Sequence, residues 1–156
     1  MRVSRLADFA VVSMTHVAQK DQDTHTAAAV ASATQLPLPT VAKVLARLCH
    51  AGLLRSTRGA TGGYTLARPA SAISVGSIVS AFDGPVALTR CIRSGAARCD
   101  VEAVCPARVG LQRINVAVRK ALEDVSLAEV ARPVSVARAA ARQASAHGLP
   151  AAKAGH

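Results

Sequence analysis

The chain has 156 residues, enough for one domain with extensions, and it carries a formal net charge of +10. Only 2% of its residues are aromatic while 51% are hydrophobic, so a core must be built mainly from Ala, Val, Leu and Ile. The charge favours an anionic partner, and no apolar run approaches the roughly 20 residues of a membrane span. Asp8 interrupts the apolar N-terminal segment and no small-residue cleavage site follows it. We therefore expect a cytoplasmic chain with no signal peptide and no membrane partner.

Three helices are expected in the first third of the chain. Residues 4–19 begin at Ser4, which can cap a helix, and their apolar side chains fall near one face. Residues 26–34 are rich in alanine, a strong helix former. A third helix should run from about Pro39 to Ala51, because proline suits the first helical position and Gly52 suits the left-handed residue after the end.

Residues 55–68 read RSTRGATGGYTLAR, with three arginines, three glycines and no acid. The β-favouring residues on both sides predict two short strands, and the glycines predict the tip of a hairpin. Helix, turn, helix and hairpin in this order indicate a winged helix-turn-helix, in which the second helix of the pair enters the major groove of DNA. The hairpin, or wing, then lies along the backbone or in the neighbouring minor groove. Arginine is favoured in a narrow minor groove, which explains Arg58 beside Gly59.

The distribution of charge agrees with a DNA-binding face. No acidic residue occurs between Asp23 and Asp83, whereas a solvated surface would mix the two signs. Thr40 and Lys43 can hydrogen-bond base edges, and Arg47 is better placed for a phosphate. The predicted DNA-binding residues are Pro39, Thr40, Ala42, Lys43, Arg47, Arg58 and Gly59.

The second half of the chain contains a further short helix over 73–85, a cysteine-containing loop and a long helix over 107–126. Apolar residues recur at spacings of three and four along the long helix, so we expect this stripe to be buried against a second copy of the chain. The stripe consists of Leu111, Ile114, Val118, Leu122 and Val125. The expected organisation is a winged helix-turn-helix domain (1–85), a cysteine loop (86–106), a dimerisation helix (107–130) and a disordered basic tail (131–156).

Cys91, Cys99 and Cys105 lie within fifteen residues of one another. In a cytoplasmic protein such thiols serve more often as metal ligands or free thiols than as disulfides. Thiolates suit zinc or an iron–sulfur cluster, and three of them leave one coordination position for a residue from elsewhere. The candidates for that position are Asp8, Glu102, His50, His16 and Cys49, although Cys49 on the third helix is better explained as a packing residue.

The chain resembles the Rrf-type winged-helix transcriptional regulators, a family that includes IscR and NsrR. The residues that carry the resemblance are MRVSRLADFAV at the start, LPLPTVAKVLARLCHAGLLRSTRGATGGYTLARP through helix and wing, and the three-cysteine loop, so it covers about 1–131. DGPVALTRC and LQRINVAVRKALEDVSLAEVA look most like the regulators of the SUF iron–sulfur assembly system.

The resemblance implies a homodimer that binds a double-stranded DNA operator and represses SUF-type iron–sulfur assembly genes. It also implies an iron–sulfur cluster, [2Fe–2S] or [4Fe–4S], that changes the affinity for DNA. IscR has a histidine three residues after its last cysteine, where this chain has Arg108, and arginine cannot ligate iron. NsrR-like members use an acidic residue of the first helix from the partner subunit, and Asp8 stands at the matching place.

Three other interpretations use the same residues. A metal-free regulator would sense oxidants through disulfides among Cys91, Cys99 and Cys105. A zinc-bound DNA-binding module would need the same thiols without sensing. An iron–sulfur electron carrier would need the cysteines but not the basic helix and wing. The sequence contains no pattern typical of a catalytic site, so we expect no enzyme.

Overall fold

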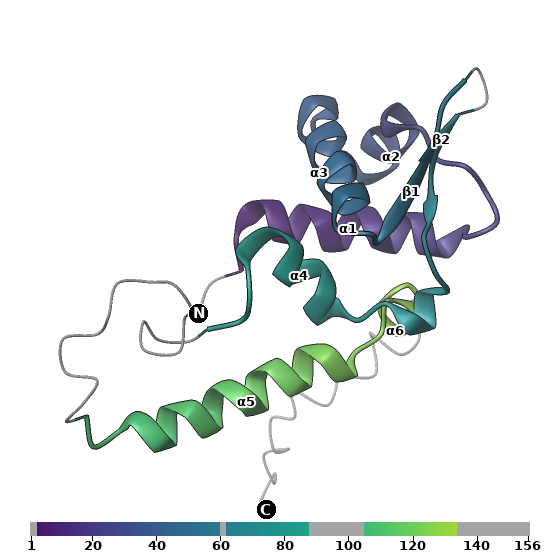
Figure 1. Cartoon of the computed structure of the whole chain (residues 1–156). Helices are drawn as coiled ribbons and strands as arrows, with labels where there is room; N and C mark the ends of the chain where they lie inside the picture. The colour runs from purple at the N-terminus through teal and green to yellow at the C-terminus, as the bar shows by residue number, and fades with distance from the viewer. Residues whose placement is uncertain (1–2, 60–61, 88–104, 134–156) are drawn as a thin grey trace, which may run out of the picture.

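The computed structural model describes residues 3–59, 62–87 and 105–133, and Figure 1 shows its elements with the labels used below. In chain order they are α1 (Arg5–Gln19), α2 (Ala27–Thr34), α3 (Leu38–His50), β1 (Leu54–Thr57), β2 (Gly63–Leu66), the short 3-10 helix η1 (Ala70–Ala72), α4 (Val75–Asp83), α5 (Arg108–Asp124) and α6 (Leu127–Val130). The fold class expected from the sequence, mainly α with a small β-wing, is confirmed.

Side-chain caps determine where α1, α2 and α4 begin. The hydroxyl groups of Ser4, Thr26 and Ser74 each accept a hydrogen bond from the backbone N–H of the third residue of the helix that follows. Such a cap satisfies a donor that has no partner inside the first turn.

α3 lies one residue earlier at each end than the sequence predicts. Pro37 occupies the N-cap and Pro39 lies in the first turn, where the fixed φ of proline fits a helix and its missing N–H costs nothing. Gly52 has a φ of 69°, which is the left-handed conformation predicted for the glycine after this helix.

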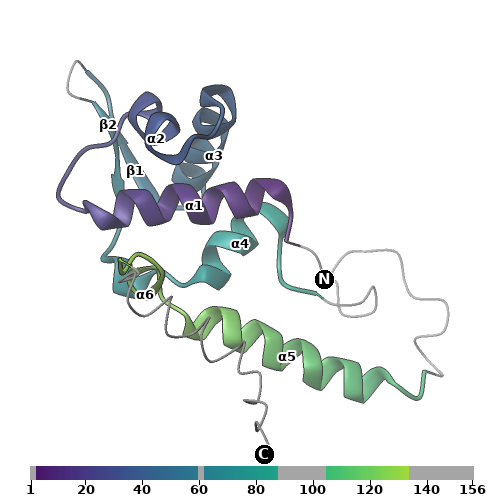
Figure 2. The ribbon, with the colours of Figure 1, turned by 180° about the vertical axis from the view of Figure 1, so that it is seen from behind.

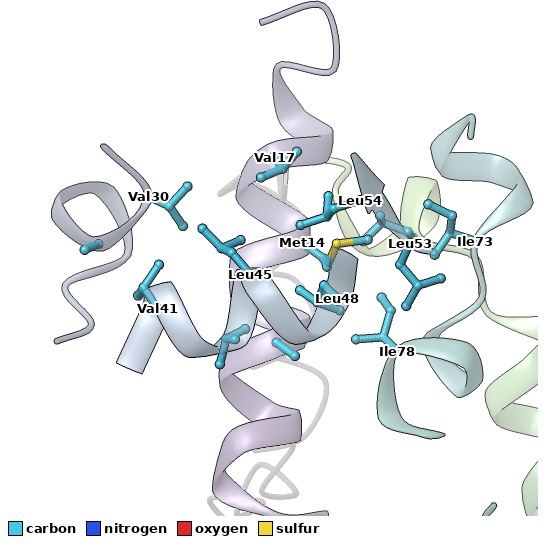
Figure 3. Close-up of a cluster of buried hydrophobic side chains, with 14 residues drawn as sticks. Met14, Val17, Val30, Val41, Leu45, Leu48, Leu53, Leu54, Ile73 and Ile78 are labelled. Atoms are coloured by element: carbon cyan, nitrogen blue, oxygen red, sulfur yellow. The ribbon is translucent and has the colours of Figure 1, made fainter. Parts of the chain in front are cut away.

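α1 is the central element of the molecule. α2, α3 and the β1–β2 hairpin lie on one side of it, and α4, α5 and α6 lie on the other (Figures 1 and 2). Aliphatic side chains fill the space between these elements, as Figure 3 shows. The core residues labelled there are Met14, Val17, Val30, Val41, Leu45, Leu48, Leu53, Leu54, Ile73 and Ile78.

The hairpin is anchored to the connection between α1 and α2. Its register pairs Leu54 with Leu66 and Thr57 with Gly63. The N–H of Tyr64 donates to the carbonyl oxygen of His25 at 2.8 Å, and the N–H of His25 donates to the carbonyl oxygen of Tyr64 at 3.0 Å. A Cβ atom on Gly63 would lie 2.7 Å from the carbonyl oxygen of His25, so that glycine allows the strand to approach this connection.

The long helix predicted over 107–126 is α5, and the rest of the 107–130 segment forms a second helix. α5 ends at Asp124, and the separate helix α6 begins after Ser126, whose hydroxyl forms a capping box with Glu129. Backbone hydrogen bonds join this region to the start of α4: the N–H of Val75 donates to the carbonyl oxygen of Val125 at 2.9 Å, and the N–H of Leu127 donates to that of Ile73 at 2.7 Å.

The apolar stripe of α5 is only partly covered within the single chain. Leu111, Val118 and Leu122 are half-buried, whereas Ile114 is 53% exposed and Val125 is 40% exposed. The predicted burial of the stripe is therefore incomplete without a partner.

Two expected segments fall largely outside the described residues. They are the cysteine loop between residues 88 and 104 and the tail from residue 134 onward. Within the described ranges, no helix is long and apolar enough to cross a bilayer.

Candidate nucleic-acid interface

α3 presents one buried and one exposed face. Val41, Val44, Leu45 and Leu48 are buried in the core. The predicted contact residues Pro39, Lys43 and Arg47 are exposed, while Thr40 and Ala42 are half-buried at the edges of the exposed face. The strong segregation of the two faces orients α3, because rotating the helix would expose its leucines and valines.

Within the described residues, two exposed basic side chains on α3 and the hairpin form no ion pair. In the described part of the chain, the ion pairs lie on α5, where Arg119 meets Glu123 and Lys120 meets Asp124. Lys43 on α3 and Arg55 on β1 are exposed and take part in no ion pair there. α3 and the hairpin lie on the same side of α1 (Figure 1), and residues 38–66, which form them, contain basic but no acidic side chains. These two elements therefore present positive charge on that side.

The wing carries its predicted residues at its outer end. Arg58 and Gly59 are exposed directly after β1, and Gly59 has a φ of 119°, a conformation that side chains rarely adopt. Tyr64 is half-buried and packs against the core.

Arg47 has a contact that the sequence does not indicate. Its Nε donates to the carbonyl oxygen of Ala81 at 2.8 Å and its second terminal nitrogen donates to that of Phe82 at 3.1 Å. The guanidinium also lies 5.0 Å from the centre of the Phe82 ring. In this structure Arg47 therefore joins the last turn of α3 to the C-terminal end of α4.

A pair of histidines lies beneath the hairpin. The rings of His16 and His25 are 5.4 Å apart, edge to face, and Nε2 of His25 lies 3.0 Å from the carbonyl oxygen of Lys20. Burial, with smaller contributions from His25 and Lys20, lowers the pKa of His16. His16 lies on α1 and His25, nine residues later, in the connection to α2, so no spacing rule could have found this pair.

The predicted metal ligands are only partly within the described residues. Asp8 is exposed in the first turn of α1, and Cys105 is half-buried without a disulfide just before α5. Cys91 and Cys99, like the alternative ligand Glu102, lie outside the described ranges. Among the residues that are described, no three His, Cys, Asp or Glu side chains gather closely enough to hold a metal ion.

The other candidate ligands have different surroundings. Cys49 is half-buried and packs on the core, in agreement with its interpretation as a packing residue. His16 is engaged with His25, and His50 is exposed at the end of α3.

Comparisons with known proteins agree with this fold. The Rrf2 family, described as "Iron-dependent Transcriptional regulator", matches residues 3–133. The HTH-type transcriptional regulator IscR of Yersinia enterocolitica is 32% identical over 144 residues, which cover 92% of this chain and 87% of that protein. The structure of CymR (YrzC), the global cysteine regulator of B. subtilis, is similar with a TM-score of 0.69 at 25% identity, covering 84% of this chain and 96% of that one. IscR of T. potens, 22% identical over 97% of this chain and 94% of its own, has the same fold with a TM-score of 0.64.

Proposed function

Because this chain belongs to the Rrf2 family of iron-dependent transcriptional regulators, we propose that it binds an operator as a homodimer and that an iron–sulfur cluster in its cysteine loop controls this binding. The chain is a transcriptional regulator and not an enzyme. The proposed target is a set of iron–sulfur assembly genes of the SUF type, which the chain represses.

The proposed DNA contact is supported by the exposed surface of α3 and the wing, which contains no acidic residue. Lys43 would hydrogen-bond a base edge in the major groove, with Pro39, Thr40 and Ala42 beside it. Arg58, next to Gly59, would enter the minor groove or contact the backbone. α3 is assigned this role because it is the second helix of the helix-turn-helix, and in that motif the second helix enters the major groove.

The proposed cluster ligands are Cys91, Cys99 and Cys105, with Asp8 from the partner subunit as the fourth. The donor set fits such a group, because thiolates are soft ligands and Cys105 is not in a disulfide. Asp8 fits a ligand supplied in trans, because its side chain is exposed at the surface of α1. When bound, the cluster would make the state of the loop depend on iron supply and on oxidants.

A metal-free thiol regulator is the second candidate, and it is supported by the similarity to CymR of Staphylococcus aureus, whose structure is known in an oxidized form. In that case oxidation would join two of the loop cysteines in a disulfide. The electron-carrier interpretation does not explain the match to transcriptional regulators over most of the chain.

Anaerobic purification distinguishes a regulator that binds an iron–sulfur cluster from a metal-free thiol regulator. We expect coloured protein that contains iron and acid-labile sulfide, and loss of both when any of the three loop cysteines is replaced by Ala. Asp8→Ala should keep the fold and the dimer but shorten the lifetime of the cluster in oxygen. Colourless protein whose thiols titrate reversibly with an oxidant would support the metal-free regulator instead, and zinc in place of iron would support the zinc module.

The DNA contact is tested by measuring the affinity of the full chain for a selected operator and for random duplex DNA. Lys43→Ala should reduce the difference between the two, because the lost contact is to a base. Arg58→Ala should cost about 1–3 kcal/mol of operator binding, the scale of a good groove contact. Gln112→Ala on α5 is the control. If both α3 and wing variants bind like the wild type, the assignment of this face is wrong.

A further inference from the structure

Leu38 is the one large apolar residue of α3 whose side chain is not buried in the core. The other four large apolar residues of this helix are at most 1% exposed, whereas Leu38 is 47% exposed. A polar residue at this first helical position would leave the core unchanged. The fold therefore does not explain why leucine is there.

The residues next to Leu38 in the chain are apolar and provide no backbone hydrogen-bond donor. Pro37 and Pro39 flank it, both are exposed, and neither has a backbone N–H. Leu38 also lines an open surface hollow between α2 and α3, together with Ala28 and Ser32. Recognition helices commonly read base edges by hydrogen bonds from their first turn, but the exposed residues of this first turn, Leu38 and Pro39, are apolar, while Thr40 is half-buried.

Only one group on the base edges of the major groove matches such a surface. It is the C5-methyl group of thymine, which apolar side chains contact, whereas the other groups that distinguish the base pairs there are hydrogen-bond donors and acceptors. We propose that Leu38 reads a thymine methyl group in each half-site of the operator. This inference rests on the DNA binding proposed above and adds a specificity-determining residue to it.

The relation of Leu38 to Lys43 makes the inference more specific. Five residues of α-helix span about 7.5 Å, which is roughly two base-pair steps of 3.4 Å for a helix lying along the groove. The thymine read by Leu38 and the base read by Lys43 should therefore lie about two base pairs apart. In this arrangement Lys43 makes the hydrogen bond to a base edge, and Leu38 makes the apolar contact with a thymine methyl group.

The test uses replacement of thymine by deoxyuridine, which removes only the methyl group. An operator is first selected from a random duplex library with the full chain, and each thymine of one half-site is then replaced singly. We expect one position at which the replacement weakens wild-type binding about fourfold, the effect of burying roughly one methyl group. At that position, 5-methylcytosine should bind better than cytosine.

The variants identify the residue that reads this methyl group. Leu38→Ala should bind thymine and deoxyuridine equally at that position, while Leu38→Met should keep most of the difference. Val130→Ala, an exposed apolar residue of α6, is the matched control and should behave like the wild type. Thermal melting of all three variants establishes that they are folded.

Three results would overturn the inference. The first is a selected half-site without a constant thymine, and the second is a wild type that tolerates every deoxyuridine replacement. The third is a methyl effect that persists in Leu38→Ala, which would assign the contact to another residue. If the wild-type chain selects no sequence at all, the proposed DNA-binding function fails as well, so the two failures are distinguishable.

Discussion

The guanidinium of Arg47 caps the C-terminal end of α4. The last carbonyl groups of a helix lack partners within it and carry a partial negative charge, so a cation that donates to two of them is well placed. Ala81 and Phe82 supply these carbonyl oxygens, and the Phe82 ring lies against the same guanidinium. The contact joins the helix proposed to enter the groove with the helix that precedes the cysteine loop.

We predict that Arg47→Met lowers the free energy of unfolding by about 1 kcal/mol, because α4 loses charged hydrogen bonds at an exposed helix end. Urea denaturation measures this change, and Arg55→Met, at an exposed arginine of β1, is the control. If Arg47 also contacts a phosphate, Arg47→Met would in addition lower the salt dependence of DNA binding by about one charge. Loss of stability with an unchanged salt dependence would restrict Arg47 to the role of joining α3 to α4.

His16 makes the stability of the chain dependent on pH. Burial lowers the pKa of His16 below 6.5 in the folded chain, with His25 and Lys20 contributing. The unfolded chain therefore binds more protons than the folded chain between the lowered pKa and about 6.5. It follows that the free energy of unfolding falls as the pH drops through this window and recovers above it.

We predict that His16→Gln makes the free energy of unfolding less dependent on pH below about 6.5. The measurement is a series of urea titrations between pH 5 and pH 8, the range around the ordinary histidine pKa. His50→Gln, at the exposed end of α3, serves as the control. Parallel pH curves for the wild type and His16→Gln would contradict the assignment of this effect to His16.

At the scale of elements, the position of the hairpin depends on a close backbone approach. β2 passes so near the connection between α1 and α2 that a Cβ on Gly63 would meet the backbone of His25 and the side chain of Thr24. The Cβ would lie 2.9 Å from the carbonyl carbon of His25 and 2.8 Å from Cγ2 of Thr24. Because backbone atoms cannot move aside as a flexible side chain can, the hairpin itself must shift.

We predict that Gly63→Ala destabilises the chain by about 1–3 kcal/mol, the usual scale for overpacking, and weakens operator binding through the displaced wing. Gly110→Ala on α5 is the control, since a Cβ there meets nothing within 4 Å in the single chain. Thermal melting and operator titration of both variants provide the comparison. Equal melting temperatures for Gly63→Ala and the wild type would show that the approach is not tight.

Local sequence rules predict the elements well because caps and glycines act within a few residues. Ser4, Thr26 and Gly52 mark helix ends in both sequence and structure. The break between α5 and α6 also has a local signal, the Ser126-x-x-Glu129 capping box, which the assignment of 107–130 to one dimerisation helix did not use. Contacts between distant residues are different: Arg47 and Ala81 are 34 residues apart, and no spacing rule joins them.

The candidate site likewise has features that local sequence predicts and features that depend on contacts between distant residues. The basic face of α3 and the wing could be predicted, since amphipathic spacing fixes which side of a helix is exposed. The use of Arg47 and the pairing of His16 with His25 could not, because they depend on how α1, α3 and α4 pack together.

At the scale of the whole molecule, α5 leaves apolar surface uncovered. Val109 is 67% exposed, Ile114 53% and Val116 51%. Exposed apolar residues in this number on one helix are typical of a surface that binds a partner. In the homodimer proposed above, a second copy of the chain would cover α5.

We predict that Ile114→Glu converts the dimer to a monomer, because a charge at the contact must be desolvated without a partner. Light scattering after size-exclusion chromatography measures the mass, and circular dichroism measures retained helix. Gln112→Glu places the same charge on the same helix as the control. A dimer that survives Ile114→Glu with unchanged concentration dependence would exclude this part of α5 from the interface.

Tyr64 gives the protein an internal optical signal. The chain contains one tyrosine and no tryptophan, so its ultraviolet fluorescence comes essentially from a single side chain. That side chain lies in β2, beside the backbone bridge to His25 and against the core. Tyrosine emission from the unlabelled protein therefore reports on the packing of the hairpin against the core. Displacement of the hairpin by duplex DNA, by low pH or by Gly63→Ala can be followed in real time without attaching a dye.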